Sequence, residues 1–129
     1  MKPKFIDHIL IIVKDVKRTE EFYSKILDEP IHKDDYSVAW RIGDTKVFFG
    51  LPFKELESNT FNRNRIGLNH LAFGARTLEE LKEWENRLND AGIKNSTIIK
   101  DKYKKREYIW FDDPDGIRQE LYLRYEGEE

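Results

Sequence analysis

Ile6-Asp7-His8-Ile9 and Leu68-Asn69-His70-Leu71 are two copies of one four-residue pattern, 62 residues apart in the chain. The same offset carries apolar residues of the first half onto apolar residues of the second: Val16 onto Leu78, Phe22 onto Trp84 and Ile26 onto Leu88. A repeat of this length is one supersecondary unit used twice, and its copies must share a core. The chain is therefore predicted to hold two similar modules.

Each copy of the pattern precedes a segment with helical periodicity. In the first half, Asp15 is a natural N-cap, and apolar residues recur at helical spacing from Val16 to Leu27. In the second half, Thr77 and Glu80 form a capping box before an apolar stripe, and Gly92 fits the position just after a helix. One helix is thus expected at 16–27 and another between Thr77 and Gly92.

Strand-like segments fill the rest of each module. Residues 5–13 are almost wholly apolar and predict a strand buried on both faces. Further strands are expected at Ile31–Tyr36, Ser37–Ile42, Thr45–Leu51, Ile93–Ile99, Arg106–Asp112 and Ile117–Arg124. The sequence therefore predicts an α+β fold of two tandem βαβββ modules within a single domain, 1–129. Module one covers about 4–51, a linker about 52–65, and module two about 66–125.

Composition limits the class of function. The 129 residues include 23 basic and 25 acidic side chains, a net charge of −2, which argues against a dedicated nucleic-acid binder. The chain has no cysteine, so thiolate metal sites and cysteine nucleophiles are excluded. No apolar run approaches the roughly 20 residues of a membrane span, and the N-terminus lacks a signal-peptide core. We expect a cytoplasmic protein.

Two of the three histidines, His8 and His70, occupy the same position in the two repeats. A lone histidine in a strand is more often a core or rim residue than a ligand. Two at equivalent positions can converge on one point, because the strands that carry them would lie side by side. The third histidine, His32, lies on an edge-like strand and is given no role.

An oxygen donor for the same point is expected on the last strand. Alternation places Ile117, Gln119, Leu121 and Leu123 on one face, apolar enough to pack on a helix. Glu120 then faces the opposite, concave side. Two interpretations stay open for it: a metal ligand, or a carboxylate that only pairs with Arg118 or a lysine in solvent.

Two histidines and one carboxylate form the facial-triad ligand set, which leaves coordination positions open for water and substrate. Open positions are typical of a catalytic metal rather than a structural one. His8, His70 and Glu120 are thus candidate ligands for a divalent ion, and the set suits Fe²⁺, Mn²⁺, Ni²⁺, Co²⁺ or Zn²⁺ equally.

The tandem modules, their paired histidines and the final segment Asp113-Pro114-Asp115-Gly116-Ile117-Arg118-Gln119-Glu120-Leu121 resemble the vicinal oxygen chelate superfamily. That superfamily includes glyoxalase I, bleomycin-binding proteins, extradiol dioxygenases and fosfomycin-resistance proteins. The resemblance implies curled sheets around a cup, with a metal held by His8, His70 and Glu120. It implies a small oxygen-bearing substrate chelated on that metal, with lyase, transferase or dioxygenase chemistry.

The same resemblance implies a homodimer, in which His8 of one subunit completes a site with His70 and Glu120 of the other. The alternative is a cup built within one chain. Glyoxalase I enzymes carry a fourth ligand late in the first module, where this chain reads Lys46 to Leu51 without a carboxylate or amide. A different class of function is a metal-free small-molecule or antibiotic-binding protein of the bleomycin-resistance type, which normally lacks the complete triad.

Aromatic and basic residues are candidates for the wall of the cup. Tyr108 and Trp110 share a face of their strand and are expected to bind substrate, although aromatic residues favour sheet cores in any protein. Weaker candidates of the same kind are Trp40, Phe48 and Arg118. The basic run from Lys100 to Arg106 fits either a docking site for phosphate or carboxylate or a solvated loop.

Overall fold

The computed structural model describes residues 1–103 and 106–128 and divides into two compact units, Met1–Asn59 and Thr60–Glu129. Each unit has the element order βαβββ, so the predicted tandem α+β architecture is confirmed. Lys104 and Lys105, two members of the basic run singled out from the sequence, lie outside the described residues.

The first unit is one four-stranded mixed sheet with one helix. Its elements are β1 (His8–Ile12), α1 (Val16–Leu27), β2 (His32–Lys33), β3 (Ser37–Ile42) and β4 (Thr45–Gly50). The strand order is β1-β4-β3-β2; β1 runs parallel to β4, and the other pairs are antiparallel. Helix α1 packs on β3 and β4 and leaves the opposite face of the sheet open.

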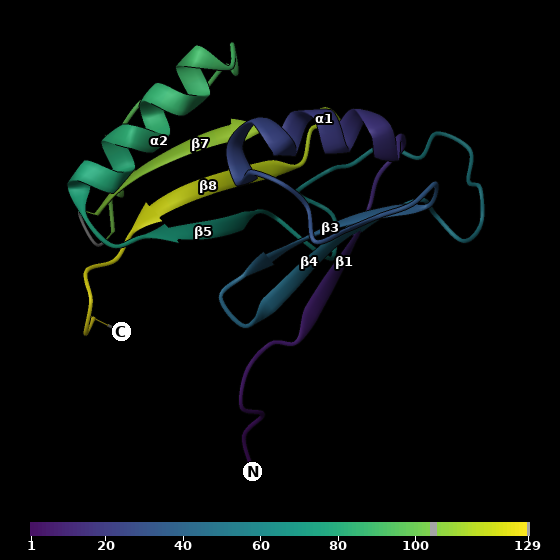
Figure 1. Ribbon diagram of the computed structural model, residues 1–129, viewed down its shortest axis with the longest axis horizontal. Coiled ribbons are helices and arrows are strands. Elements are labelled where there is room, and N and C mark those ends of the chain that lie inside the picture. The colour runs from purple at the N-terminus through teal and green to yellow at the C-terminus, as the bar shows by residue number, and fades with distance from the viewer. Residues whose placement is uncertain (104–105, 129) are drawn as a thin grey trace. The chain divides into compact units, whose positions relative to one another are not determined.

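The second unit repeats this plan. Its elements are β5 (Leu71–Ala75), α2 (Leu78–Asp90), β6 (Ile99–Lys100), β7 (Glu107–Asp112) and β8 (Arg118–Leu123). The strand order is β5-β8-β7-β6, again with one parallel pair, β5 with β8. Figure 1 shows α2 lying along one face of β5, β8 and β7.

Capping residues identified in the sequence begin both helices. The Asp15 carboxylate accepts the backbone N–H of Arg18 at 3.0 Å, and the Thr77 hydroxyl accepts that of Glu80 at 3.1 Å. These bonds satisfy donors that a helix N-terminus otherwise leaves unpaired. Gly92 ends α2 with φ 72°, a left-handed conformation that suits glycine. Both helices therefore begin where the sequence predicts.

The cores lie between each helix and its sheet. In the first unit, Tyr23 of α1 stacks on Phe49 of β4 with ring centroids 4.4 Å apart. Trp40 belongs to the same core: it is 2% exposed, and its ring lies 5.8 Å from that of Tyr23. The structure therefore places Trp40 on the helix side of its sheet rather than on the open face expected from the sequence, because α1 covers that side of β3.

The first strand also differs from its sequence prediction. β1 covers His8–Ile12 rather than 5–13, and it is not buried on both faces. Ile11 is buried, whereas Leu10 and Ile12 are 44% and 40% exposed. One helix covers only one face of a single sheet, so the alternate residues of an apolar strand remain on the open side.

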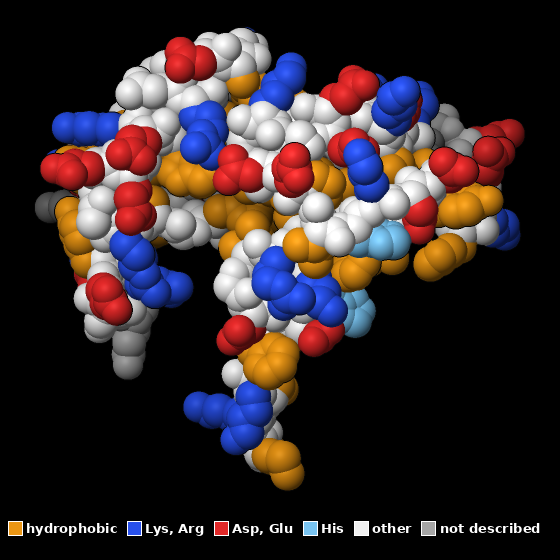
Figure 2. All heavy atoms as spheres, viewed as in Figure 1, with side chains coloured by type: hydrophobic (Ala, Val, Ile, Leu, Met, Phe, Trp, Pro, Cys, Tyr) orange, Lys and Arg blue, Asp and Glu red, His pale blue; other side chains and the backbone are white. Residues whose placement is uncertain are grey.

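The remaining differences are of length. The expected strand 31–36 shortens to the two-residue β2, and the expected strand 93–99 is mostly not a strand, because β6 begins only at Ile99. Among the described residues, no helix is long and apolar enough to cross a membrane. Acidic and basic side chains are interspersed on the face shown in Figure 2, consistent with the near balance of charge in the sequence.

Candidate functional site

The turn between β7 and β8 fixes where the candidate ligand Glu120 stands. Asp113 is buried, and its carboxylate accepts the backbone N–H groups of Asp115 and Ile117, both at 2.9 Å. Gly116 closes the turn with φ 79°, where a side chain would be strained. The resulting hairpin register pairs Trp110 with Glu120. The Asp-Pro-Asp-Gly sequence thus acts as a positioning device for the strand that follows it.

Alternation along β8 then sorts its side chains as predicted. Gln119, Leu121 and Leu123 are buried on the helix side. Glu120 points to the open face, where the parallel neighbour β5 carries Ala72 at the paired position. Because that neighbour is small, the Glu120 carboxylate reaches past it towards His70, the residue just before β5.

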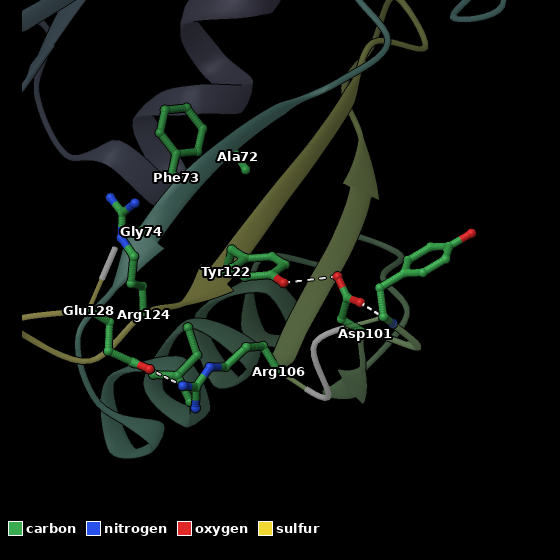
Figure 3. A pocket seen from close by; sticks show the side chains of 10 residues that line it. Ala72, Phe73, Gly74, Asp101, Arg106, Tyr122, Arg124 and Glu128 are labelled. Atoms are coloured by element: carbon green, nitrogen blue, oxygen red, sulfur yellow. Dashed lines mark hydrogen bonds and ion pairs between the residues drawn. The ribbon is translucent and has the colours of Figure 1, made fainter.

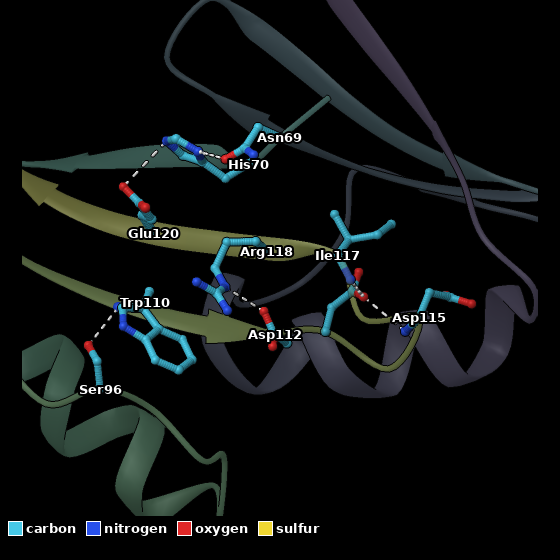
Figure 4. A network of polar contacts seen from close by, with 10 residues as sticks. Asn69, His70, Ser96, Trp110, Asp112, Asp115, Ile117, Arg118 and Glu120 are labelled. Atoms are coloured by element: carbon cyan, nitrogen blue, oxygen red, sulfur yellow. Dashed lines mark hydrogen bonds and ion pairs between the residues drawn. The ribbon is translucent and has the colours of Figure 1, made fainter. Parts of the chain in front are cut away.

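His70 and Glu120 form the centre of the candidate site (Figure 4). The Asn69 amide nitrogen donates to the carbonyl of Arg63 at 2.9 Å, which turns the amide oxygen of Asn69 towards Nδ1 of His70 at 2.8 Å. Nδ1 must therefore carry the proton. In the neutral ring Nε2 is left with a lone pair, and it faces Oε1 of Glu120 at 3.5 Å. A proton on Nε2 or a cation held between the two atoms satisfies both groups.

His8 is held in the same way in the first unit. Its Nδ1 lies 2.8 Å from Oδ2 of Asp7, and this hydrogen bond is the main cause that lowers the pKa of the Asp7 carboxyl. The carboxylate fixes Nδ1 as the donor and leaves Nε2 available, an arrangement common for metal-binding histidines. The residues before the two histidines were visible in the sequence, but only the structure assigns them this orienting role.

Four of the expected wall residues stand on open faces. Tyr108 and Trp110 share the face of Glu120 on β7, as alternation predicts. Arg118 is already partnered: its Nε donates to Asp112 at 2.6 Å, and its guanidinium lies 4.0 Å from the Trp110 ring centroid. Phe48 stands on the open face of the first sheet, with its ring 6.0 Å from that of His8.

A cavity of about 580 Å³ opens on the same face of the second unit (Figure 3). Tyr122, two residues beyond Glu120, lines it and donates its hydroxyl to Asp101 at 2.9 Å. Burial, followed by this bond to Asp101, raises the pKa of the Tyr122 phenol. Strand alternation places Tyr122 on the same face as Glu120, but the sequence gives it no role. Its position two residues beyond Glu120 was the signal that could have identified it as a lining residue.

One family model matches almost the whole chain, including the histidine at the start of each module and the glutamate on the last strand. The model is that of the Glyoxalase/Bleomycin resistance protein/Dioxygenase superfamily, and it covers residues 5–121. The chain belongs to this superfamily.

Individual proteins are similar to this chain over more than nine tenths of its length. The uncharacterized protein YaeR of Escherichia coli (strain K12) is 30% identical, over 92% of this chain and 95% of its own. The metallothiol transferase FosB of Bacillus licheniformis is 28% identical, over 91% and 73%. A glyoxalase/bleomycin resistance protein/dioxygenase domain from Frankia sp. EAN1pec superposes with a TM-score of 0.78 at 22% identity, over 98% and 96%, which shows the shared fold.

Within the superfamily plan, the two modules differ at the ligand position. β1 pairs Leu10 with Phe48 as β5 pairs Ala72 with Glu120, so Phe48 is the counterpart of the glutamate. At the position that corresponds to Glu120, the first module therefore carries an aromatic ring. Across 1–103 and 106–128, the structure holds no cluster of three or more His, Cys, Asp or Glu that could bind a metal. The pair His70 and Glu120 supplies two donors, and a complete set needs one more.

Proposed function

We propose that this chain is a metal-dependent enzyme of the vicinal oxygen chelate type, with His8, His70 and Glu120 as the metal ligands. The observation that carries the proposal is the pair of facing acceptors, Nε2 of His70 and Oε1 of Glu120, 3.5 Å apart. Two ligand atoms each about 2.1 Å from one metal ion at a tetrahedral angle are about 3.4 Å apart. The donor set and its spacing thus fit a divalent cation.

Burial of the two partners also suits ligands. The Glu120 side chain is 15% exposed and that of His70 is 41% exposed, so the carboxylate is largely removed from water while the imidazole remains reachable. A mostly buried carboxylate needs a cationic partner. Arg118 does not serve, because its Nε donates to Asp112 and its guanidinium stacks on Trp110.

Bound there, the metal would supply a Lewis acid that stabilises a developing oxyanion on a substrate chelated through two oxygens. The chain's own residues would bind and orient that substrate. Trp110 and Tyr108 offer an apolar wall with polar tips beside Glu120. Phe48 extends an apolar surface next to His8 and carries no base, which favours reactions that need no proton abstraction at that position.

Metal titration by calorimetry of the single variants His8→Ala, His70→Ala and Glu120→Gln tests the proposal. Each should lower metal affinity by at least about 10–100-fold, the cost typical even of residues that only orient ligands. His32→Ala is the matched control and should bind as the parent does, since His32 bonds Asp34 at 3.1 Å. Full metal affinity in Glu120→Gln would mean that Glu120 merely forms an ion pair with a protonated His70. No metal binding by the parent would favour a metal-free binding protein.

We further propose a homodimer in which each site combines His8 of one subunit with His70 and Glu120 of the other. Mixing the His8→Ala and His70→Ala proteins and allowing subunits to exchange should then restore metal binding, because one site of each mixed dimer keeps all three ligands. If each site is built within one chain, every site in the mixture lacks a ligand, and no binding returns.

A further inference from the structure

Two arginines, Arg106 and Arg124, line the cavity beside Tyr122. Arg106 directly precedes β7, and its carbonyl accepts the N–H of Asp101 at 2.6 Å, which closes the β6–β7 hairpin. Its guanidinium lies 5.3 Å from the ring centroid of Tyr125 and reaches into the cavity. Asp101 is engaged elsewhere, since its two oxygens accept from the Tyr122 hydroxyl and the N–H of Tyr103.

The Arg106 guanidinium is paired with a carboxylate from the C-terminal segment. Glu128 forms an ion pair with Arg106 through one oxygen, and its other oxygen accepts the backbone N–H of Tyr125 at 2.7 Å. Figure 3 shows Glu128 turned into the cavity towards Arg106. The two side chains are only 34% and 31% exposed, so the pair sits in the mouth of the cavity rather than on the outer surface.

The floor of the cavity is open enough to admit a ligand. On β5, the cavity is lined by Ala72, Phe73 and Gly74, and a Cβ built at Gly74 would meet no atom within 4 Å. Ala72 pairs with Glu120 and Gly74 with Tyr122, so the lining residues of β5 lie in the same two rows as Glu120 and Tyr122. A small molecule can thus lie along β5 between the two positions.

We propose that Arg106 binds a carboxylate group of the ligand, and that Glu128 is an internal stand-in which leaves when the ligand enters. Guanidinium–carboxylate pairing is strong and geometrically specific, and one carboxylate replaces another at the same donors. Arg106 lies four residues before Trp110, the strand partner of Glu120. At about 3.3 Å per residue, this separation is about 13 Å along the strand. The substrate class is therefore an elongated molecule with chelating oxygens at one end and a carboxylate at the other. This inference rests on the proposed function only for the metal-bound end.

Adipate, a six-carbon dicarboxylate, is the probe, with its neutral diamide as the control ligand. Binding to the metal-free full chain is followed by NMR titration, so the result does not depend on the metal site. Glu128→Gln removes the internal competitor and should tighten adipate binding by about fivefold or more. Apparent affinity falls in proportion to the fraction of molecules in which Arg106 is free of Glu128, and a fraction of about one fifth gives a fivefold loss. Glu126→Gln makes the same change of charge at an exposed position and should leave affinity unchanged.

Arg106→Gln should abolish saturable adipate binding, and Arg106→Lys should weaken it because lysine lacks the planar fork. Arg87→Gln removes an arginine that stacks on Trp84 of α2 and should bind as the parent does. Equal affinities in the parent, Glu128→Gln and Glu126→Gln would overturn the proposal, as would parent-like binding in Arg106→Gln or equally tight binding of the diamide. Metal affinity should persist in Arg106→Gln, so a failure here is distinguishable from a failure of the proposed metal site.

Discussion

The open faces of the two modules carry different chemistry on the same frame. In the second module, the row that crosses β5, β8 and β7 reads Ala72, Glu120 and Trp110. The matching row across β1, β4 and β3 reads Leu10, Phe48 and Ala39. Both modules keep a histidine whose Nδ1 bonds the preceding residue. A duplicated fold can therefore retain one oriented histidine in each copy while the rest of the open face differs between the copies.

The largest expected contrast in stability is between Trp40 on β3 and Trp110 on β7, the third strands of the two modules. Trp40 is 2% exposed between α1 and its sheet, whereas Trp110 stands on the open face under Arg118. Trp40→Ala should cost about 3–5 kcal/mol of unfolding free energy, the range for a large core side chain. Trp110→Ala should cost about 1 kcal/mol, because it loses mainly a cation–π contact. Urea unfolding measures both, and equal losses would contradict the assignment of faces.

On the helix-facing sides, the polar Gln119 in β8 corresponds to the apolar Val47 in β4. Gln119 is fully buried, and within the described part of the chain neither polar atom of its amide has a hydrogen-bond partner. Gln119→Leu should therefore raise the unfolding free energy by about 1–3 kcal/mol. The reciprocal change, Val47→Gln, should lower it by a similar amount. A loss of stability in Gln119→Leu would show that the amide is satisfied in solution.

Introducing a carboxylate into the first module tests the correspondence between Phe48 and Glu120. In a chain that already carries Glu120→Ala, Phe48→Glu should recover about tenfold in metal affinity, because it places a carboxylate beside His8 as Glu120 stands beside His70. Phe48→Gln in the same background is the control without the charge. Calorimetric titration of the three proteins measures the recovery, and equal affinities would break the proposed equivalence.

The smallest expected effect is an acid sensitivity of the β2–β3 turn in the first module. The N–H groups of Tyr36 and Ser37 donate to Asp34 and lower the pKa of its carboxyl. A carboxyl with a lowered folded-state pKa stabilises the protein above its unfolded pKa of about 4 and loses that contribution as pH falls through the folded value. Asp34→Asn should therefore be slightly less stable than the parent at pH 7 and equally stable near pH 2. A difference that does not change with pH would contradict this.

Local signals accounted for most of the elements that position the site. The caps Asp15 and Thr77, and the Asp113 turn, act within four residues along the chain, and each forms as the sequence predicts. Strand alternation likewise placed Glu120, Tyr108 and Trp110 on one face. These features depend on backbone geometry that neighbouring residues set among themselves, so they are readable without a tertiary structure.

Contacts between distant segments required the structure. Whether Trp40 lies in a core, and whether Leu10 is exposed, depends on which face a helix covers, and alternation alone does not say which. The cavity is assembled from residues of β5 and β8, from Asp101, Tyr103 and Arg106, and from Glu128 near the C-terminus. The sequence by itself determined the repeated modules and the candidate ligands. Only tertiary packing decided which face each side chain joined and which carboxylate meets Arg106, because burial and ion pairing are set by neighbours in space.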